Sequence, residues 1–336
     1  QAYKHRSVSL REIVTACAEK AGHRTISFGN DTIRAAFSTI DLSNLLGNTA
    51  NKRLLQAFEQ ARPVATALCR EVDLNDFKEH SRFRLDLGSG LVEVAPSGEL
   101  NLNTLGETKA TNQLKTYGSL LTLTRTDIVN DDLGAFLRIP EDFGYEAAAL
   151  VDHLFATRLL SNPTMEDGYS LFSNDHSNLG TAALSDAALQ DGIEAFMKQT
   201  AVSGRPIAVM PKYLLVPPEV YFTAKKLLNS AELVPTGDSD TTGIPTGNPY
   251  LNMGMVPLAM PHLSNSSYTG YSSVAWYLFA DPRRADTFEI GYLRGARTPT
   301  IESADVDFAS LGMRWRVFWD VGVREQEYRT VYKSTT

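Results

Sequence analysis

Residues 82–94, RFRLDLGSGLVEV, alternate apolar and polar side chains in the manner of a strand with one dry face and one wet face. The stretch from Gly88 to about Asn112 is mostly small and polar and contains no sustained apolar run. A second alternating segment, QLKTYGSLLTLTRTDIV, begins at Gln113. The two segments predict a long hairpin, and about ten residues of strand would carry its tip roughly 30 Å from its base. Because a two-stranded ribbon is marginally stable in water, its apolar face needs another surface to cover it.

The composition indicates a folded protein and excludes several classes. The chain has 336 residues, of which 43% are hydrophobic, enough for one large core or two to three small ones. Its formal net charge of −7 argues against a dedicated nucleic-acid binder, because such binders neutralise phosphates with Lys and Arg. No apolar run reaches the roughly 18 to 20 residues of a membrane span. Cys17 and Cys69 lie far apart, outside any CxxC spacing, so we expect neither a disulfide framework nor a metal site.

The N-terminal part, residues 1–76, is predicted to be an arm followed by linked helices. Ser9 and Glu12 have the spacing of a capping box, which favours a helix start at Ser9. A second helix is expected over residues 48–61, ending before Pro63.

A long helix is predicted over residues 140–161. Pro140 suits the first helical position, and the acidic residues that follow it favour the positive end of the helix dipole. About 22 residues of helix would be some 33 Å long. One face repeats with helical spacing and is expected to be buried: Phe143, Ala147, Leu150, Val151 and Leu154.

The pattern after the polar loop DGYSLFSNDHSNLG predicts an α/β segment. Ser185 is expected to cap a helix that ends at Gly204, and Pro218 lies near the start of another helix. The first of these helices has an apolar face of Leu189, Ile193, Phe196 and Met197. The apolar segments IAVM, LLVP, VAWYLFA and FEIGYLRG predict strands.

The stretch GDSDTTGIPTGNP, residues 237–249, predicts an exposed loop because Gly, Pro, Ser and Thr dominate it. Its start resembles a calcium loop, but Pro249 stands where that motif needs a bidentate Glu, so a flexible loop is favoured. The residues singled out in it are Asp238, Asp240, Pro245 and Asn248.

The segment RWRVFWDVGV near the C-terminus alternates strictly, which predicts a strand with one buried face. That face carries Trp315, Val317, Trp319, Val321 and Val323. We expect Trp315 and Trp319 to pack in a core, since aromatic side chains on the inner face of a strand usually do. The elements together predict an α+β fold.

The chain carries little that resembles a catalytic site. It has no GxSxG elbow, no Walker A loop and no GxGxxG after a strand. The best candidate is SNDHSN, in which Asp175, His176 and Ser177 bring acid, imidazole and hydroxyl together. Triads are assembled from separated segments, so a polar turn in which His176 and Asn178 bond to backbone is favoured. We expect no enzyme activity, no cofactor and no metal.

Several stretches resemble the Mu-like major head subunit family, some of whose members are made fused behind a ClpP-like prohead protease. They are LKTYGSLLTLTR, VNDDLGAFLRIPEDFG, LFSNDHSNLG, LLVPPEV, WYLFADP and MRWRVFWDVGV. The order of elements also resembles the Hong Kong 97-type major capsid protein of tailed bacteriophages, over roughly residues 10 to 333.

The resemblance implies a division of the chain and a role for each part. The parts are an arm with helices (1–76), an E-loop hairpin (77–130), a peripheral domain (131–182) with a spine helix (140–161), an axial domain (183–295) and a return to the peripheral domain (296–336). The hairpin would contact a neighbouring subunit through Phe83, Leu85, Leu87, Leu121 and Leu123. The loop of residues 237–249 would lie near the centre of a hexamer or pentamer.

The implied function is that of a shell subunit, which self-assembles into the hexamers and pentamers of an icosahedral capsid around double-stranded DNA, bound without sequence specificity. Further implied partners are a portal, decoration proteins, and a scaffold or prohead protease. Synthesis would take place in the host cytoplasm and the final location would be the virion. Gln1 would follow a maturation cleavage. Two alternatives stay open: an encapsulin-like compartment shell, and a hydrolase that uses His176.

Overall fold

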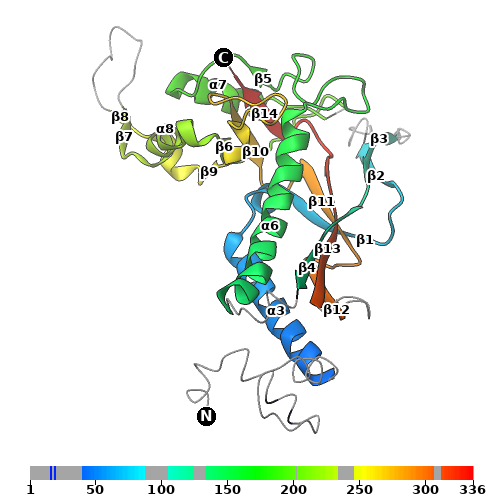
Figure 1. Cartoon of the computed structure of the whole chain (residues 1–336). Coiled ribbons are helices and arrows are strands. Elements are labelled where there is room, and N and C mark those ends of the chain that lie inside the picture. Colours follow the sequence, from blue (N-terminus) through cyan, green and yellow to red (C-terminus); the bar gives the residue numbers. More distant parts are fainter. Residues whose placement is uncertain are drawn as a thin grey trace. The chain divides into compact units, whose positions relative to one another are not determined.

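The protein, analysed as a computed structural model, contains both helices and sheets, as the predicted α+β class requires (Figure 1). It forms two compact units: residues 1–62, 116–150 and 296–320 make the first, and residues 63–115, 151–295 and 321–336 make the second. The chain passes from one unit to the other within helix α6 (Leu133–Leu160) and strand β13 (Gly312–Glu325). The structure describes residues 16, 19, 40–87, 105–124, 133–201, 203–233, 246–305 and 312–335.

Among its described elements, the first unit combines helices α3 (Ile40–Ala61) and α6 with strands β4 (Lys115–Thr124), β12 (Thr300–Asp305) and β13. Helix α3 contacts strand β12, which runs antiparallel to the first half of β13. Strand β4 also pairs with β13. Arg53 on α3 forms an ion pair with Glu141 on α6 at 2.9 Å.

The predicted return strand of the hairpin is wrong. Strand β2 (His80–Leu87) pairs with β3 (Leu105–Asn112), a segment whose small polar residues predict part of the extended tip. The expected partner forms β4 instead, where Gly118 approaches β13 so closely that a Cβ there would lie 3.0 Å from the Val317 carbonyl oxygen. The sequences of β2 and β4 both alternate between apolar and polar residues. Such alternation identifies a strand but does not select the strand with which it pairs.

The long helix begins earlier than expected. Helix α6 starts at Leu133, so the prediction that Pro140 opens it is wrong. A proline inside a helix lacks the N–H that would bond the carbonyl four residues earlier, here that of Phe136. Pro140 is buried, as are Ala147 and Ala148 further along the same unit, and this burial favours the continuous helix over a break.

The other N-terminal helices also differ from expectation in their bounds. Helix α3 starts eight residues before the predicted 48–61 and ends at Ala61, ahead of Pro63 as predicted. The helix predicted from Ser9 lies outside the described residues except for Ala16 and Glu19, which are both helical.

The second unit is built on a five-stranded sheet in the order β5-β14-β10-β6-β9. Its strands are β5 (Leu179–Gly180), β14 (Val331–Ser334), β10 (Trp276–Ala280), β6 (Pro211–Val216) and β9 (Val256–Ala259). Helices α7 (Asp186–Met197) and α8 (Pro218–Asn229) pack on it (Figure 1). Ser185 caps α7 by accepting a hydrogen bond from the Ala188 amide, and Pro218 occupies the first turn of α8, as predicted.

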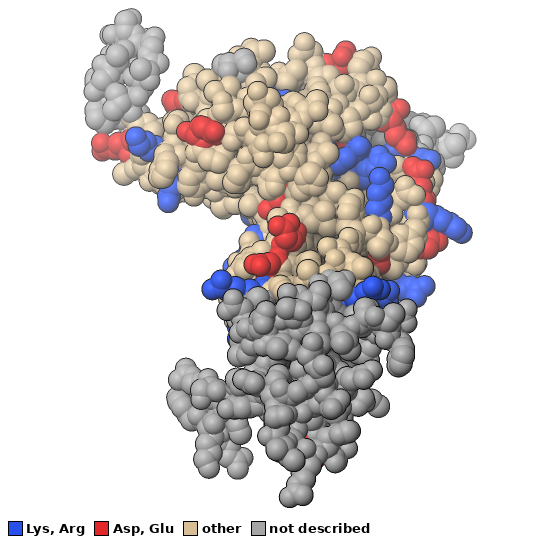
Figure 2. Space-filling model, viewed as in Figure 1, with Lys and Arg blue, Asp and Glu red and all other residues tan. Residues whose placement is uncertain are grey.

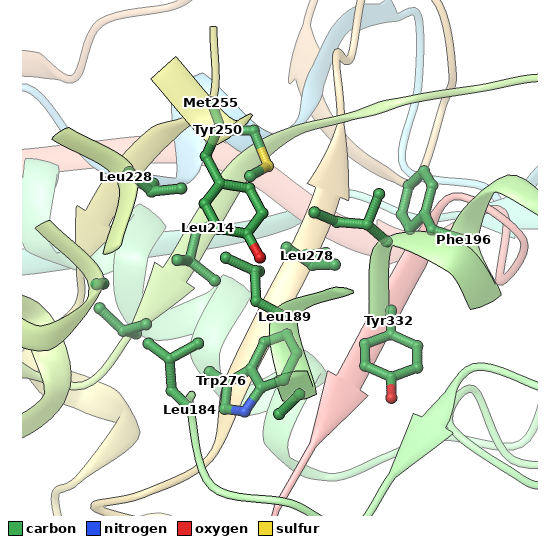
Figure 3. Packing of buried hydrophobic residues seen from close by; sticks show 14 of the residues in the cluster. Leu184, Leu189, Phe196, Leu214, Leu228, Tyr250, Met255, Trp276, Leu278 and Tyr332 are labelled. Carbon is green, nitrogen blue, oxygen red and sulfur yellow. The ribbon is translucent and has the colours of Figure 1, made fainter. Parts of the chain in front are cut away.

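The central strand β10 is buried on both faces, which explains its continuous apolar run. Trp276, Leu278 and Ala280 belong to the core formed with α7 and α8 (Figure 3). Tyr277 and Phe279 point the other way and contact aromatic rings from the loop before β5, from α6 and from β11 (Phe288–Leu293). Gly192 lets α7 lie flat on this core, because a Cβ there would be 2.9 Å from the Trp276 ring.

Three smaller expectations for the second unit are wrong. The segment IAVM, residues 207–210, is not a strand, because Ala208 has a φ of 52°, a left-handed value that breaks an extended chain. Helix α7 ends at Met197 and not at Gly204, which lies in a later turn with a φ of 78°. Met197 is exposed, so the buried face of α7 ends at Phe196.

A second set of strands in this unit carries the hairpin. Strand β1 (Arg70–Leu74) runs parallel to β11 (Phe288–Leu293), which pairs antiparallel with the second half of β13. Arg158 of α6 donates from Nε to Glu325 of β13 at 3.0 Å. The remaining short elements are α4 (Ala65–Leu68), β7 (Glu232–Leu233), β8 (Thr246–Gly247), η2 (Pro249–Asn252) and η3 (Pro261–Leu263).

Candidate assembly interface

The hairpin β2–β3 forms a sheet of its own. Its antiparallel register runs from His80 opposite Asn112 to Leu87 opposite Leu105. Within the described ranges, these two strands pair only with each other. A two-stranded ribbon of this kind needs contacts beyond its own ladder to be stable.

The two faces of β2 differ in chemistry and in exposure. His80, Arg82 and Arg84 alternate along one face and are half-buried against the second unit. Ser81 and Phe83 lie on the opposite face and are exposed, and the Phe83 side chain is 61% exposed. The polar face of the ribbon therefore contacts its own subunit, and the apolar face points away from it.

The half-buried arginines bind buried acids. Arg82 forms an ion pair with Glu289 of β11, and Arg84 forms one with Glu327, which follows β13. Figure 2 shows basic and acidic side chains gathered together on the right of the view, where Figure 1 labels β1, β2 and β3. The ribbon is thus held at its root by charge and not by a packed apolar face.

The predicted contact residues fall on two different strands. Leu85 and Leu87 continue β2 beyond Phe83, with side chains outside the described part of the structure. Leu121 and Leu123 lie on β4 in the first unit, so their assignment to the hairpin is wrong. Leu121 is half-buried there, and the side chain of Leu123 is not described.

The predicted axial loop is only partly described. Asp238, Asp240 and Pro245 lie outside the described residues. Asn248 is 6% exposed, which corrects its assignment to an exposed loop. Its side chain donates to the Leu227 and Ser230 carbonyls at 2.8 Å and accepts from the Tyr250 amide at 2.8 Å. Asn248 therefore ties the end of α8 to η2.

Sequence reasoning missed a second exposed apolar group in this unit. Phe222 of α8, Leu251 of η2 and Val256 of β9 are 72%, 48% and 42% exposed, and α8 contacts both other elements. The signal was present in α8, where Phe222 falls off the face defined by the buried Ala224 and Leu228.

The outer edge of β9 offers little backbone for pairing. The Met260 amide donates to the Val216 carbonyl at 3.0 Å, so alternate N–H groups of this segment point toward β6. Pro257 occupies a position that points the other way and has no N–H to offer. Pro257 therefore removes one of the backbone donors that this edge could offer for pairing.

Trp315 and Trp319 are both buried, each with 4% exposure, in the first unit. The Trp319 Nε1 donates to the Ala296 carbonyl at 2.9 Å, and its ring meets that of Phe58 edge-on at 5.3 Å. These contacts join β13 to α3 and to the segment before β12.

His176 lies in the polar turn that the sequence favoured. Its Nε2 is 2.8 Å from an Asp167 carboxylate oxygen, its Nδ1 is 3.2 Å from the Leu171 carbonyl, and its ring stacks on Tyr328 at 3.6 Å. Asn178 donates to the Leu171 carbonyl at 2.8 Å. Both imidazole nitrogens are thus occupied by partners that fold the loop.

Neither a metal centre nor a membrane helix is found among the described residues. No group of three or more His, Cys, Asp or Glu in that part of the chain is arranged to hold a metal ion. No helix there combines the length and the apolar character needed to cross a bilayer.

Comparison with known protein families identifies the family to which this chain belongs. The family model described as "Phage capsid protein" matches residues 107–334, over half of the chain. The chain belongs to this phage capsid protein family. A search of curated protein sequences finds no match to the capsid protein.

Solved structures of phage capsids share the fold of the capsid protein. The mature capsid of bacteriophage PhiM1 aligns with a TM-score of 0.53 and 13% identity over 82% of this chain and 87% of that one. The structure from Microbacterium phage Oxtober96 gives 0.51 and 11% over 82% and 91% of the two chains. The capsid of Cyanophage P-SCSP1u gives 0.50 and 13% over 81% and 88%.

The family and the fold confirm the main predictions. The capsid protein has the Hong Kong 97-type α+β fold and is a structural subunit that forms capsid oligomers in the virion. It is not an enzyme, so the hydrolase alternative with His176 is set aside. The family match also favours a phage capsid over an encapsulin-like compartment. The closer likeness to the Mu-like family stays a prediction.

Proposed function

We propose that the β2–β3 hairpin of each capsid protein lies on a neighbouring copy and joins subunits into hexamers and pentamers. The observation that carries the proposal is the exposure of Phe83 on a ribbon whose polar face already contacts its own subunit. Leu85 and Leu87 continue the same strand toward the tip. The apolar contact would therefore involve Phe83, Leu85 and Leu87.

The energetics favour a contact between copies. Full burial of a Phe side chain contributes about 1.5 to 3 kcal/mol, and most of that is unrealised while Phe83 is exposed. When the ribbon of one subunit packs on a different surface of the next subunit, the contact is head-to-tail. Subunits joined by such contacts can form closed rings. Because the contact repeats around the ring, a modest free energy of burial from each copy adds up over the whole assembly.

The axial part of the same unit would contribute a second contact. The loop with Asp238, Asp240 and Pro245 is proposed to lie near the centre of the hexamer or pentamer. The exposed Phe222 of α8 supports a contact between copies in this part of the unit, because aromatic side chains are enriched at protein interfaces.

Further partners follow from the function of a shell. We propose that the assembled capsid encloses double-stranded DNA without sequence specificity, in keeping with a net charge of −7. A portal, decoration proteins and a scaffold or prohead protease are proposed partners, with proteolytic maturation during assembly. DNA recovered from purified particles after nuclease treatment of their exterior would support enclosure, and empty or enzyme-filled particles would contradict it.

The test of the hairpin contact is the substitution Phe83→Asp. Because Phe83 is exposed in the subunit, the variant should keep the circular dichroism and melting temperature of the wild type. It should lose at least tenfold in particle yield, measured by sedimentation and electron microscopy. Tyr271→Asp, at another exposed aromatic residue of the same unit, is the matched control and should assemble normally. Wild-type particle yield from Phe83→Asp would overturn the proposal.

A further inference from the structure

The root of the hairpin is joined to the second unit by one buried carboxylate that binds both strands. Glu289 of β11 is 1% exposed. One of its oxygens pairs with Arg82 of β2, and the other accepts a hydrogen bond at 3.0 Å from the Asn112 side chain at the end of β3. Asn112 is itself buried and accepts from the Gln113 amide at 2.8 Å. The hairpin therefore supplies both described hydrogen-bond partners of the Glu289 side chain.

A second buried carboxylate fixes β2 two residues further along. Arg84 pairs with Glu327, whose carboxylate also accepts from the Arg329 guanidinium at 3.0 Å. Arg84 is half-buried, and the resulting loss of hydration lowers the pKa of its guanidinium. On the β3 side, the Gln326 side chain donates to the Thr111 carbonyl at 3.4 Å.

The space beside these contacts is hollow. A cavity of 460 Å³ lies on one side of the root, lined among others by Lys109, Thr111 and Glu327. A smaller cavity of 160 Å³, lined among others by Arg82 and Arg84, lies beside it. Ala110 of β3 lines both. Since apolar packing does not fill the root, the ion pairs carry the directional constraint.

We propose that Arg82 and Arg84 are positioning residues that fix the direction of the hairpin before assembly, by holding its root on the buried carboxylates of Glu289 and Glu327. Swinging the ribbon away would remove Arg82, the cation that binds the Glu289 carboxylate, and leave this buried group with only the weaker electrostatic attraction of Arg70, and loss of one partner of a buried ion pair is costly. The ribbon thus reaches its neighbour in one preset direction, which lowers the entropic cost of the contact. This inference rests on the proposed role of the hairpin in subunit contacts.

The two arginines differ in a way that supplies a mild variant and a severe one. Removal of Arg84 leaves Glu327 with Arg329 as a second cation, so Arg84→Met should fold. Removal of Arg82 leaves the 1% exposed Glu289 with the neutral Asn112 as its described hydrogen-bond partner and with Arg70 as a nearby cation that does not bind it, so Arg82→Met is the more severe change. Arg84→Lys retains the charge and serves as the conservative variant.

The direction of the hairpin can be measured across the larger cavity. Lys109 of β3 and Glu166 of the facing loop both line it and are both exposed, so spin labels on cysteines at these positions report its opening. Cys69 is buried and its burial raises the pKa of its thiol, so it should not label, and only Cys17 needs replacement by Ser. The full-length unassembled chain is used, and particle yield is measured on the same variants without labels.

The parent protein should give one narrow distance distribution. Arg84→Met should broaden it and lower particle yield at least tenfold, and Arg84→Lys should restore both. Arg316→Met, which breaks an exposed ion pair with Glu302 in the other unit, is the control and should leave the distribution unchanged.

The outcomes separate the inference from the function on which it rests. A narrow distribution in both Arg84→Met and Arg82→Met would overturn the positioning role, whether or not Phe83→Asp blocks assembly. A broad distribution with wild-type particle yield would instead show that assembly ignores the hairpin, which overturns the proposed contact itself. A broad distance distribution and a low particle yield in Arg84→Met, both restored in Arg84→Lys, would support the positioning role and the proposed hairpin contact together.

Discussion

Gly144 on α6 lies against Ala57 on α3 with no space between the two helices for a side chain. A Cβ at position 144 would lie 2.8 Å from the Ala57 Cβ, and it would also meet the backbone of Leu54 and Phe58. Real Cβ atoms essentially never come within 3.0 Å of such neighbours. The crossing of these helices in the first unit therefore depends on a glycine.

We expect Gly144→Ala to destabilise the first unit despite the higher helix propensity of alanine. Alanine should gain up to about 1 kcal/mol from propensity, whereas forcing two backbones apart typically costs about 1 to 3 kcal/mol. Urea unfolding of the unassembled chain should show a lower midpoint. Gly247→Ala is the control, because a Cβ there meets nothing within 4 Å. Equal midpoints for both variants would show that the helices can separate freely.

The sequence predicts elements of this fold better than it predicts their partners. The segment VAWYLFA predicts a strand because a strand buried on both faces has a continuous apolar run. Ser185 predicts a helix start because its side chain can cap the first turn, and Pro218 does so because proline suits the first turn of a helix. These signals are local. Each signal involves only a few neighbouring residues, so it can be recognised without knowledge of the fold.

The hairpin shows what local signals leave out. Its return strand, LGETKATN, has only one large apolar residue, and Asn112 is held by Glu289, 177 residues away in the chain. The alternation of β2 predicts one apolar face that another surface must cover, and the exposure of Phe83 supports this prediction. Its polar face, with Arg82 and Arg84, was overlooked because long-range ion pairs leave no periodic pattern in the sequence.

Asn248 should matter more for the stability of the second unit than its place in a Gly/Pro-rich segment suggests. Asn248→Ala leaves three backbone groups without this partner, namely the part-buried carbonyls of Leu227 and Ser230 and the buried amide of Tyr250. We expect a loss of about 1 to 3 kcal/mol in the free energy of unfolding, measured by urea titration. Asn229→Ala, at the exposed end of α8, is the matched control. A variant as stable as this control would show that water replaces all three bonds.

Trp319 should be the most costly residue to truncate in the first unit. Trp319→Ala removes its packing against Phe58 and its bond to the Ala296 carbonyl, with an expected cost of about 3 to 5 kcal/mol. Trp319→Phe keeps most of the packing and should cost about 1 to 2 kcal/mol, mainly for the lost hydrogen bond. Thermal melting with soluble yield gives the comparison, and Leu120→Ala at an exposed position of β4 is the control. Similar losses for the Ala and Phe variants would assign the role of Trp319 to its hydrogen bond alone.

His262 should make the second unit less stable as the pH falls below about 6.5, the ordinary pKa of histidine. Its Nδ1 is buried without a hydrogen-bond partner in the described part of the chain, and burial lowers the pKa of the imidazole, with His153 acting in the same direction. A lowered folded-state pKa means that the unfolded chain binds the proton more readily, so stability present above pH 6.5 is lost as the pH falls toward the folded pKa.

The substitution His262→Leu removes this proton and should flatten the stability curve below pH 6.5. One proton gives at most about 1.4 kcal/mol per pH unit, and solvent around this half-buried ring should reduce that slope. Asp152 has the opposite effect on the pH dependence of stability. Burial raises the pKa of its carboxyl, so its contribution to the stability of the folded state is lost as the pH rises. The difference between wild-type and variant unfolding curves, taken from pH 7 to 5, therefore isolates His262. Parallel curves over that range would mean that the imidazole reaches solvent in the folded subunit and that the buried Nδ1 has no energetic consequence.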